Sequence, residues 1–201
     1  MKKLIIASTS TIHGSGYLEY LLPTLTTFFA NVKTILFIPY ARPGGISYNE
    51  YTDIAKKAFA TINIEVNSKN IIDDLKQVLE NGTPYLGTSA GSNICGVNMK
   101  NTNDMPIVYP PSFTTLGIIP FNINAHYLDP IQGSTHMGET RETRIKEFHV
   151  FNKVPVLGLR QGSWLQVLGN VISLEGTHTA RLFKQNLEAI ELEKGSLKWE
   201  V

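Results

Sequence analysis

The chain has 201 residues and a formal net charge of +1, with 18 lysines and arginines against 17 aspartates and glutamates. This length suits one α/β domain with a sizeable core, so we expect a single domain over residues 1–201. The balanced charge, with no basic stripe interleaved with aromatic residues, argues against a nucleic-acid partner.

The cysteine content and the apolar segments indicate in which cellular compartment the protein is expected. Cys95 is the single cysteine, which excludes an internal disulfide and is typical of a reducing environment. The first apolar run, Leu4–Ala7, is shorter than the roughly 7–15 residues of a signal peptide core. No stretch reaches the ~20 apolar residues of a membrane span. We therefore expect a cytoplasmic protein without membrane contact.

The N-terminal half alternates between strand and helix patterns. Short apolar runs predict buried strands over Leu4–Ser8 and Thr34–Pro39, with a helix between them over Tyr17–Ala30. The elements that follow are predicted as helix, strand, helix and strand over Tyr51–Thr61, Asn63–Val66, Ile71–Leu79 and Pro84–Thr88. This order predicts βαβ units in a parallel sheet, whose ligands bind at the carboxyl ends of the strands.

The C-terminal half has a different pattern. Leu116–Tyr127 is predicted as a strand followed by a loop, Gly138–Phe148 as a charged helix, and Val154–Leu159 as another buried strand. Beyond Trp164, short alternating segments are separated by Gly169-Asn170 and by Glu175-Gly176, which predicts hairpins.

The five residues Gly87-Thr88-Ser89-Ala90-Gly91 form a G-x-S-x-G motif between a predicted strand and a small-residue helix start. In a nucleophile elbow the serine hydroxyl stands exposed above the sheet, and bulk at either flanking glycine would collide with the turn. The Ala90 N–H would then face a developing oxyanion. The alternative is a tight structural turn without chemistry.

A serine nucleophile needs a base, and five histidines are candidates for that role: His13, His126, His136, His149 and His178. The patterns around His149 and His178 predict solvated surface positions. His13 lies in the loop after the first strand and is a weak candidate. His126 follows an apolar stretch, where a structural histidine is the common alternative, and His136 is placed to touch substrate or solvent.

The orienting carboxylate has one candidate between Ser89 and His126, because Asp104 is the sole acidic residue in that interval. A Ser–Asp–His order therefore points to Asp104 if His126 is the base. The alternative for Asp104 is a turn residue within Thr102-Asn103-Asp104.

Five segments resemble, in this order, peptidase E, the α-aspartyl dipeptidase family of serine peptidases: GTSAGSN, TNDMPIV, INAHY, GETRETRI and GLRQGSWLQV. The resemblance implies a three-layer α/β/α sandwich with a mostly parallel sheet, flavodoxin-like and related to class I glutamine amidotransferases, with C-terminal hairpins. It also implies hydrolysis of dipeptides with an N-terminal aspartyl residue, by a monomer or small homo-oligomer, without metal or cofactor.

Carried over residue by residue, the resemblance makes Ser89 the nucleophile, His126 the general base and Asp104 the acid that orients it. Ala90 supplies an oxyanion donor. Arg141 of the GETRE string would hold the substrate's aspartyl carboxylate, which a guanidinium binds in a bidentate way. Without the family, a surface ion pair on the helix would be the favoured reading of Arg141.

The chain departs from the family in two places. The first is Gln161, which stands where the family has a glutamate and cannot offset an imidazolium charge. The second is a strand with a glycine-rich loop and helix, expected to supply the second oxyanion donor but not found near residues 66–70. Either the chain lacks this unit, or the protein has it and the numbering runs straight across it. The second alternative is favoured, because a central strand is hard to delete from a parallel sheet.

Two other functions remain open at this point. An esterase or amidase could use the same elbow. A catalytically inactive relative could act as a small-ligand binding domain, which the missing unit favours.

Overall fold

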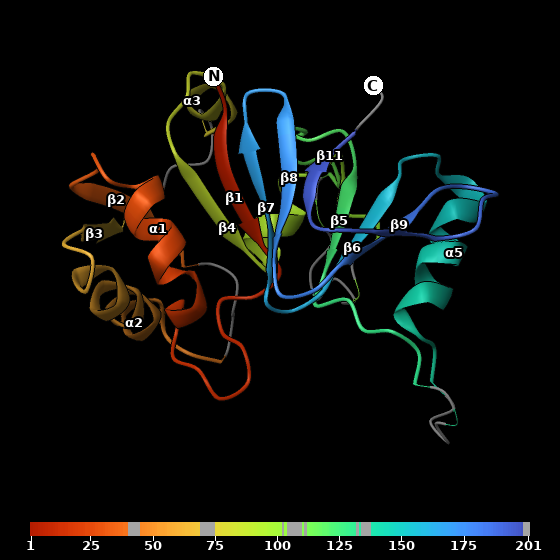
Figure 1. Cartoon of the computed structure of the whole chain (residues 1–201), viewed down its shortest axis with the longest axis horizontal. Helices are drawn as coiled ribbons and strands as arrows, with labels where there is room; N and C mark the ends of the chain where they lie inside the picture. Colours follow the sequence, from red (N-terminus) through yellow and green to blue (C-terminus); the bar gives the residue numbers. More distant parts are fainter. Residues whose placement is uncertain are drawn as a thin grey trace. The chain divides into compact units, whose positions relative to one another are not determined.

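The computed structural model in Figure 1 describes residues 1–39, 45–68, 75–101, 103, 110, 112–131, 133 and 138–198. The described chain is α/β, as predicted, and divides into two compact units. One unit is Ser10–Leu79, and the other joins Met1–Thr9 to Glu80–Val201. None of the helices in the described ranges combines the length and the apolar character that a bilayer-spanning helix needs.

The described part of the unit Ser10–Leu79 begins with a helical turn and then alternates helices with a two-stranded parallel sheet, in the order η1 Glu19–Leu21, α1 Leu22–Phe28, β2 Thr34–Phe37, α2 Tyr48–Ala60 and β3 Glu65–Ser68. Pro23 lies in the first turn of α1, where its missing N–H leaves no helical bond unmade. Ser47 and Glu50 form a capping box that starts α2. The helix α3, Leu75–Glu80, ends at the boundary of this unit.

The prediction that Thr34–Pro39 is buried on both faces is wrong. Strand β2 pairs with β3 alone among the described strands, and its side chains alternate between exposed and half-buried. Leu36 is 42% exposed. A two-stranded sheet cannot enclose either of its strands, so the apolar composition of this run does not bring burial.

The second unit contains two sheets. The first has the order β11-β8-β7-β1-β4, formed by Gly195–Leu197, Val171–Gly176, Ser163–Leu168, Lys3–Ala7 and Tyr85–Thr88. The second has the order β10-β9-β6-β5, formed by Ile190–Leu192, Ala180–Phe183, Val156–Leu159 and Asn122–Ala125. The pairs β1·β4 and β5·β6 are parallel, whereas the other strand pairs of this unit are antiparallel. The sheets are therefore mixed, and the expectation of a mostly parallel sheet is wrong, because the C-terminal strands are joined without helical crossovers.

One of the two predicted hairpin turns is present. Gly169-Asn170 joins β7 to β8, with Gly169 at a φ of 62°. The hairpin predicted at Glu175-Gly176 is wrong, because β9 pairs with β6 and β10 instead of β8. Gly176 packs against the turn at Gly162, which joins β6 of one sheet to β7 of the other. A Cβ on Gly176 would lie 2.3 Å from the Gly162 carbonyl oxygen.

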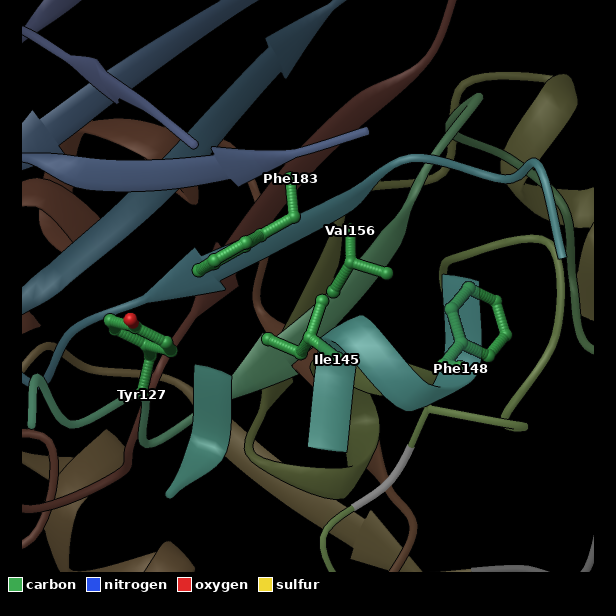
Figure 2. Close-up of a cluster of buried hydrophobic side chains, with 5 residues drawn as sticks. All are labelled: Tyr127, Ile145, Phe148, Val156 and Phe183. Atoms are coloured by element: carbon green, nitrogen blue, oxygen red, sulfur yellow. The ribbon is translucent and has the colours of Figure 1, made fainter. Parts of the chain in front are cut away.

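The helix α5, Arg141–Phe151, covers the four-stranded sheet (Figure 2). Its Ile145 and Phe148 pack with Val156 of β6, Phe183 of β9 and Tyr127 in one buried cluster. Burial of large apolar side chains contributes about 1.5–3 kcal/mol each, so this cluster fixes the helix on the sheet. The start of α5, with Arg141, is thereby held close to the segment that follows His126.

Candidate active site

Ser89 lies directly between β4 and the short helix α4, Ala90–Asn93. Its backbone has φ 50° and ψ −110°, a conformation that residues other than glycine seldom adopt. Such strain persists only where the surrounding structure imposes it, and it is frequent at functional sites. The strand, the sharp turn and the helix are those of the predicted elbow.

The two glycines of the motif have different roles. A Cβ on Gly87 would lie 2.4 Å from the Gly91 carbonyl oxygen and 2.9 Å from a ring carbon of Tyr85, so this position admits glycine alone. A Cβ on Gly91 would meet only the Tyr85 hydroxyl, at 3.6 Å. The expectation that bulk at both glycines collides with the turn is therefore wrong for Gly91, which faces open space.

Hydrogen bonds hold the first turn of α4 in place. The Tyr85 hydroxyl donates to the Gly91 carbonyl oxygen at 2.7 Å, and the Cys95 thiol donates to the same oxygen at 3.3 Å. The Ser92 hydroxyl lies between two acceptors, the Ala7 carbonyl oxygen at 2.5 Å and the Gly87 carbonyl oxygen at 3.0 Å. Burial raises the pKa of Cys95 to about 12, so the thiol stays protonated and remains a donor.

His126 follows β5 and lies against Ser89. Its Nε2 is 2.8 Å from the Ser89 Oγ, which is hydrogen-bond distance for a nucleophile and its base. The backbone of His126 has a φ of 56°, and its N–H donates to the Ser8 Oγ at 2.9 Å. Ser8, fully buried, donates in turn to the Leu159 carbonyl oxygen at 2.7 Å.

Gln161 lies on the other side of the imidazole. Its amide nitrogen is 3.3 Å from the His126 Nδ1. A half-turn of the amide presents Oε1 at the same place, where it accepts the Nδ1 proton and leaves Nε2 free to accept from Ser89. The residue that departs from the family therefore contacts the imidazole directly, as a neutral partner.

Asp104 lies outside the described residues, but its neighbour Asn103 is described. The side chains of Asn103 and Asn124 form two hydrogen bonds with each other, at 3.0 and 3.3 Å. Asn124, which is 1% exposed, also donates to the Asn101 carbonyl oxygen at 3.1 Å. The segment that leads to Asp104 is thus fixed to β5 two residues before His126.

The sequence interpretation did not single out these asparagines. Asn122 is fully buried as well, and its Oδ1 accepts from the N–H groups of Val97 and Asn98. A signal was present, because two buried amides within the strand Asn122–Ala125 need partners that the sheet does not supply. Their partners are the backbone and side chains of the preceding loop.

Arg141 is half-buried at the start of α5 and lines an open pocket of about 570 Å³. The pocket is formed by residues 128–131 and 138–141 together with Asn103 and Arg144. Arg144 pairs with Glu139 at 3.2 Å, and Lys146 pairs with Glu142 at 2.8 Å. Arg141 forms no ion pair with any described carboxylate, so its guanidinium is available to a ligand.

The other four histidines have different outcomes. His149 is 7% exposed and bonds to the Val154 carbonyl oxygen at 3.0 Å, so its prediction as a solvated residue is wrong. His178 is exposed, as predicted. His13 is exposed in the unit Ser10–Leu79, and His136 lies outside the described residues. Within the described ranges, no three His, Cys, Asp or Glu side chains gather as metal ligands would.

Comparison with known proteins gives consistent matches. The model of peptidase family S51 matches residues 4–68 and 64–174. Peptidase E of Streptomyces coelicolor is 42% identical over 226 residues, covering 96% of this chain and 92% of the relative. A protein of Drosophila melanogaster named probable alpha-aspartyl dipeptidase is 38% identical over 219 residues, covering 91% of this chain and 90% of the relative. The crystal structure of a peptidase from an acI-B1 Actinobacterium superposes with a TM-score of 0.67 at 13% identity, covering 98% of this chain and 97% of that one, which supports the fold alone.

The lengths of these matches differ in an informative way. The alignment with the Streptomyces protein spans 226 positions and this chain has 201 residues, so at least 25 positions of the relative have no counterpart. The two matches to the family model meet at residues 64–68, next to the place where the sequence lacks the expected strand and loop. The matches nevertheless cover most of the chain, and they show that it belongs to peptidase family S51.

Proposed function

We propose that this chain is a serine dipeptidase that hydrolyses dipeptides with an N-terminal aspartyl residue through an acyl-enzyme on Ser89. The observation that carries the proposal is the 2.8 Å contact between the His126 Nε2 and the Oγ of a serine on a strained strand-to-helix turn. The names of the two curated relatives support the substrate class.

In the first half-reaction, the Ser89 Oγ attacks the carbonyl carbon of the aspartyl residue while His126 Nε2 takes the hydroxyl proton. The carbonyl oxygen becomes an oxyanion and accepts a hydrogen bond from the Ala90 N–H, which donates to no acceptor in the described part of the chain. His126 then gives the proton to the leaving amine, and the C–N bond breaks to leave the aspartyl ester of Ser89.

In the second half-reaction, water replaces the amine. His126 takes a proton from the water as the water oxygen attacks the ester carbonyl, and it returns that proton to the Ser89 Oγ as the acyl bond breaks. The products are free aspartate and the second amino acid. No group other than the protein and water is needed to balance either step.

We assign the orienting carboxylate to Asp104, because the residue before it is anchored to β5. The paired amides of Asn103 and Asn124 hold this segment two residues ahead of His126. A carboxylate at that end of β5 would share the Nδ1 proton of His126 with the Gln161 amide oxygen and stabilise the imidazolium. Gln161 then assists in orienting the ring but adds no charge.

We assign recognition of the aspartyl side chain to Arg141. Its lack of a described acidic partner contrasts with the pairing of Arg144 and Lys146 on the same helix. Asp129 and Glu139 line the same pocket, but neither forms an ion pair with Arg141, so the guanidinium can pair with a carboxylate that the substrate brings. The pocket of about 570 Å³ that Arg141 lines is the space into which we place the aspartyl side chain.

We also infer that this chain lacks the strand and glycine-rich loop that the family resemblance implies, because the full sequence has 201 residues and at least 25 aligned positions of the Streptomyces relative are unmatched. This reverses the alternative that the sequence alone favoured. Loss of one oxyanion donor costs about 10²–10³ in turnover. We therefore expect kcat for an aspartyl substrate to be lower than that of the Streptomyces relative by this factor, measured side by side. An equal kcat would show that another N–H replaces the donor.

The test is hydrolysis of the anilides of aspartate, glutamate and leucine by wild type and by Ser89→Ala and Arg141→Ala. We expect the wild type to prefer the aspartyl anilide and Ser89→Ala to be inactive. Arg141→Ala should lose the aspartyl substrate selectively. Activity that survives in Ser89→Ala would overturn the mechanism, and equal loss across neutral esters in Arg141→Ala would favour a general esterase or amidase.

A second candidate is an inactive relative that binds a small ligand, which the missing unit favours. Labelling of Ser89 with a fluorophosphonate separates the two. Labelling of wild type but not of Ser89→Ala supports an activated serine, whereas folded wild-type protein that does not label supports the binding domain. We place the activity in the cytoplasm on the basis of the single buried thiol, Cys95.

A further inference from the structure

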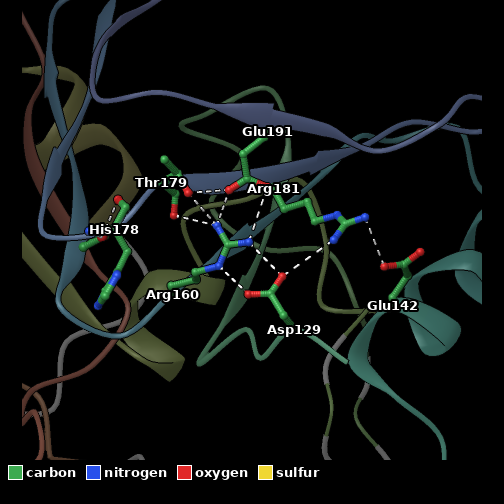
Figure 3. A network of polar contacts seen from close by, with 8 residues as sticks. Asp129, Glu142, Arg160, His178, Thr179, Arg181 and Glu191 are labelled. Carbon is green, nitrogen blue, oxygen red and sulfur yellow. Dashed lines mark hydrogen bonds and ion pairs between the residues drawn. The ribbon is translucent and has the colours of Figure 1, made fainter. Parts of the chain in front are cut away.

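We propose that Arg160 is a positioning residue for His126, and this inference rests on the proposed function. Arg160 joins the segment that carries the imidazole to the segment whose Gln161 contacts it. One is the segment from His126 to Asp129, and the other is the turn that carries Gln161. Figure 3 shows the polar network around Arg160. Neither the motif nor the family resemblance assigns a role to this arginine.

The contact between Arg160 and Asp129 is bidentate. Arg160 Nε donates to one carboxylate oxygen of Asp129 at 2.8 Å, and Nη2 donates to the other at 2.8 Å. Paired N–H donors on one carboxylate fix angle as well as distance. Asp129 lies three residues after His126, so the arginine fixes the direction in which the chain leaves the histidine.

The rest of the guanidinium is also engaged. Nη1 donates to the carbonyl oxygen and the hydroxyl of Thr179 at 3.0 and 2.9 Å, and both Nη atoms contact the Glu191 carboxylate. The Arg160 side chain is 16% exposed. Hydrogen bonding from Arg160 lowers the pKa of Asp129, which keeps that carboxylate charged across the working range of pH.

Packing against Tyr127 fixes the position of the Arg160 guanidinium. Arg160 lies over the ring of Tyr127, 5.7 Å from the centroid, a cation–π geometry. The ring fills the space above Gly158, where a Cβ would be 2.6 Å from the ring Cδ2. The Tyr127 N–H donates to the Leu159 carbonyl oxygen at 3.1 Å. Tyr127, which follows His126, and Arg160, which precedes Gln161, are thus fixed to each other.

An ordinary surface ion pair contributes about 0–1 kcal/mol and would not influence catalysis. The neighbouring contact of Arg181 with Asp129, a single one at 3.6 Å, is of that kind. Arg160 differs because its side chain is mostly buried, its fork is fully used, and it links two segments that meet at one imidazole. A displacement of about 1 Å in a catalytic group can lower turnover by roughly 10²-fold.

The test compares Arg160→Met and Arg160→Lys with wild type on the aspartyl anilide. We expect kcat to fall about 10- to 100-fold in Arg160→Met with a smaller change in KM, because His126 loses its alignment with Ser89. Arg160→Lys keeps the charge but not the fork, so it should recover only part of the loss. The matched control is Lys146→Met, which removes an exposed cation paired with Glu142 and should leave kcat unchanged.

Asp129→Asn supplies a second variant that keeps the fold if Arg160→Met does not, since the Asp129 side chain is 46% exposed. It should lower kcat in the same direction, and adding Arg160→Met to it should lower kcat little further. Folded Arg160→Met with kcat within twofold of wild type would overturn the proposal. So would a lower melting temperature with unchanged kcat, which indicates a structural role.

A readout independent of activity separates this proposal from the proposed function. The ¹⁵N shifts of the His126 ring report its tautomer and hydrogen bonds, and they should change in Arg160→Met but not in Lys146→Met. Identical ring shifts in wild type and Arg160→Met would overturn the positioning role. If the wild type hydrolyses no aspartyl anilide, the proposed function fails, and the ring shifts still decide the role of Arg160.

Discussion

The serine side and the histidine side of the candidate site are built from contacts of very different range. Ser89 follows β4 in the five-stranded sheet, and three of the bonds that hold its turn join residues four to six positions apart. The long-range bonds of this turn, from the Ser89 N–H and the Ser92 hydroxyl, both go to the Ala7 carbonyl oxygen on the neighbouring strand β1. His126 follows β5 in the four-stranded sheet. Its backbone is held by Ser8, 118 positions away, and its ring contacts Gln161, 35 positions away.

Ser89 and His126 are therefore positioned by different kinds of contact. A local turn can form its geometry from sequence neighbours, and the sheet then only has to present it. The histidine depends on where two sheets meet, and the fully buried Ser8 joins them: its N–H donates to the Ser163 carbonyl oxygen at 3.1 Å in one sheet, and its Oγ donates to Leu159 in the other. Substitutions on the two sides should therefore act differently.

The largest effect is expected from Gly87→Ala on the serine side. The new methyl group would lie 2.4 Å from the Gly91 carbonyl oxygen, so the turn has to open. We expect a loss of stability of about 1–3 kcal/mol and a fall in kcat of roughly 10²-fold. Chemical denaturation and aspartyl anilide hydrolysis measure the two effects.

Gly91→Ala is the matched control for this substitution, because its Cβ would meet only the Tyr85 hydroxyl, at 3.6 Å. Alanine also favours the helix by about 1 kcal/mol relative to glycine. The variant should therefore be as stable as wild type and keep most of its kcat. Equal losses in both variants would show that the motif tolerates neither change and that steric contact at Gly87 is not the reason.

Ser8→Ala tests the histidine side. The substitution removes a hydroxyl that bonds to His126 and Leu159, and it leaves a buried N–H without a partner, at a cost of about 1–3 kcal/mol. We expect kcat to fall about tenfold while the fluorophosphonate still reaches Ser89. Thr52→Val is the control, because it removes a hydroxyl that is bonded only within α2. A stability loss in Ser8→Ala with full kcat would remove Ser8 from the catalytic argument.

The same contrast explains what the sequence predicted. The strand, turn and helix around Ser89 were predicted because their signals lie within a dozen residues. The fold class and most helix and strand positions were predicted for the same reason. For His126 the sequence supplied one of five candidates, and the choice came from the family resemblance together with the order of Asp104. Gln161 was related to the imidazole only through the family resemblance, as a residue without charge, and nothing in the sequence indicates that Ser8 would bond to the His126 backbone.

The errors have physical causes of the same kind. The burial of Thr34–Pro39 failed because apolar composition does not specify how many strands will flank a strand. The prediction of a surface position for His149 was wrong, because the charged pattern of its helix does not reveal that the ring bonds to the Val154 carbonyl oxygen beyond the helix end. The hairpin at Glu175-Gly176 failed because a glycine can mark a crossing between sheets as well as a turn within one.

Gln161→Glu tests the histidine side, because it adds a negative charge beside the His126 ring and keeps a hydrogen-bond partner there. An ionised carboxylate beside the ring favours the imidazolium, so the base stays protonated to higher pH. The acidic limb of the kcat/KM profile should therefore move up by about one pH unit, with plateau kcat at least that of wild type. Gln161→Met, which removes the hydrogen bond without adding charge, should lower kcat and leave the limb in place. A limb that moves equally in both variants would contradict the electrostatic explanation.

The smallest effect is expected on the serine side at alkaline pH. Burial raises the pKa of the Cys95 thiol from an ordinary value near 9.0 to about 12, because the thiolate is disfavoured in the folded chain. The unfolded thiol ionises first, so stability is fully present below pH 9 and falls as pH rises from there toward 12. The free energy of unfolding of Cys95→Ala should decline less steeply with pH over this window than that of wild type. Identical slopes in the two proteins would show that the thiol does not titrate as a buried group.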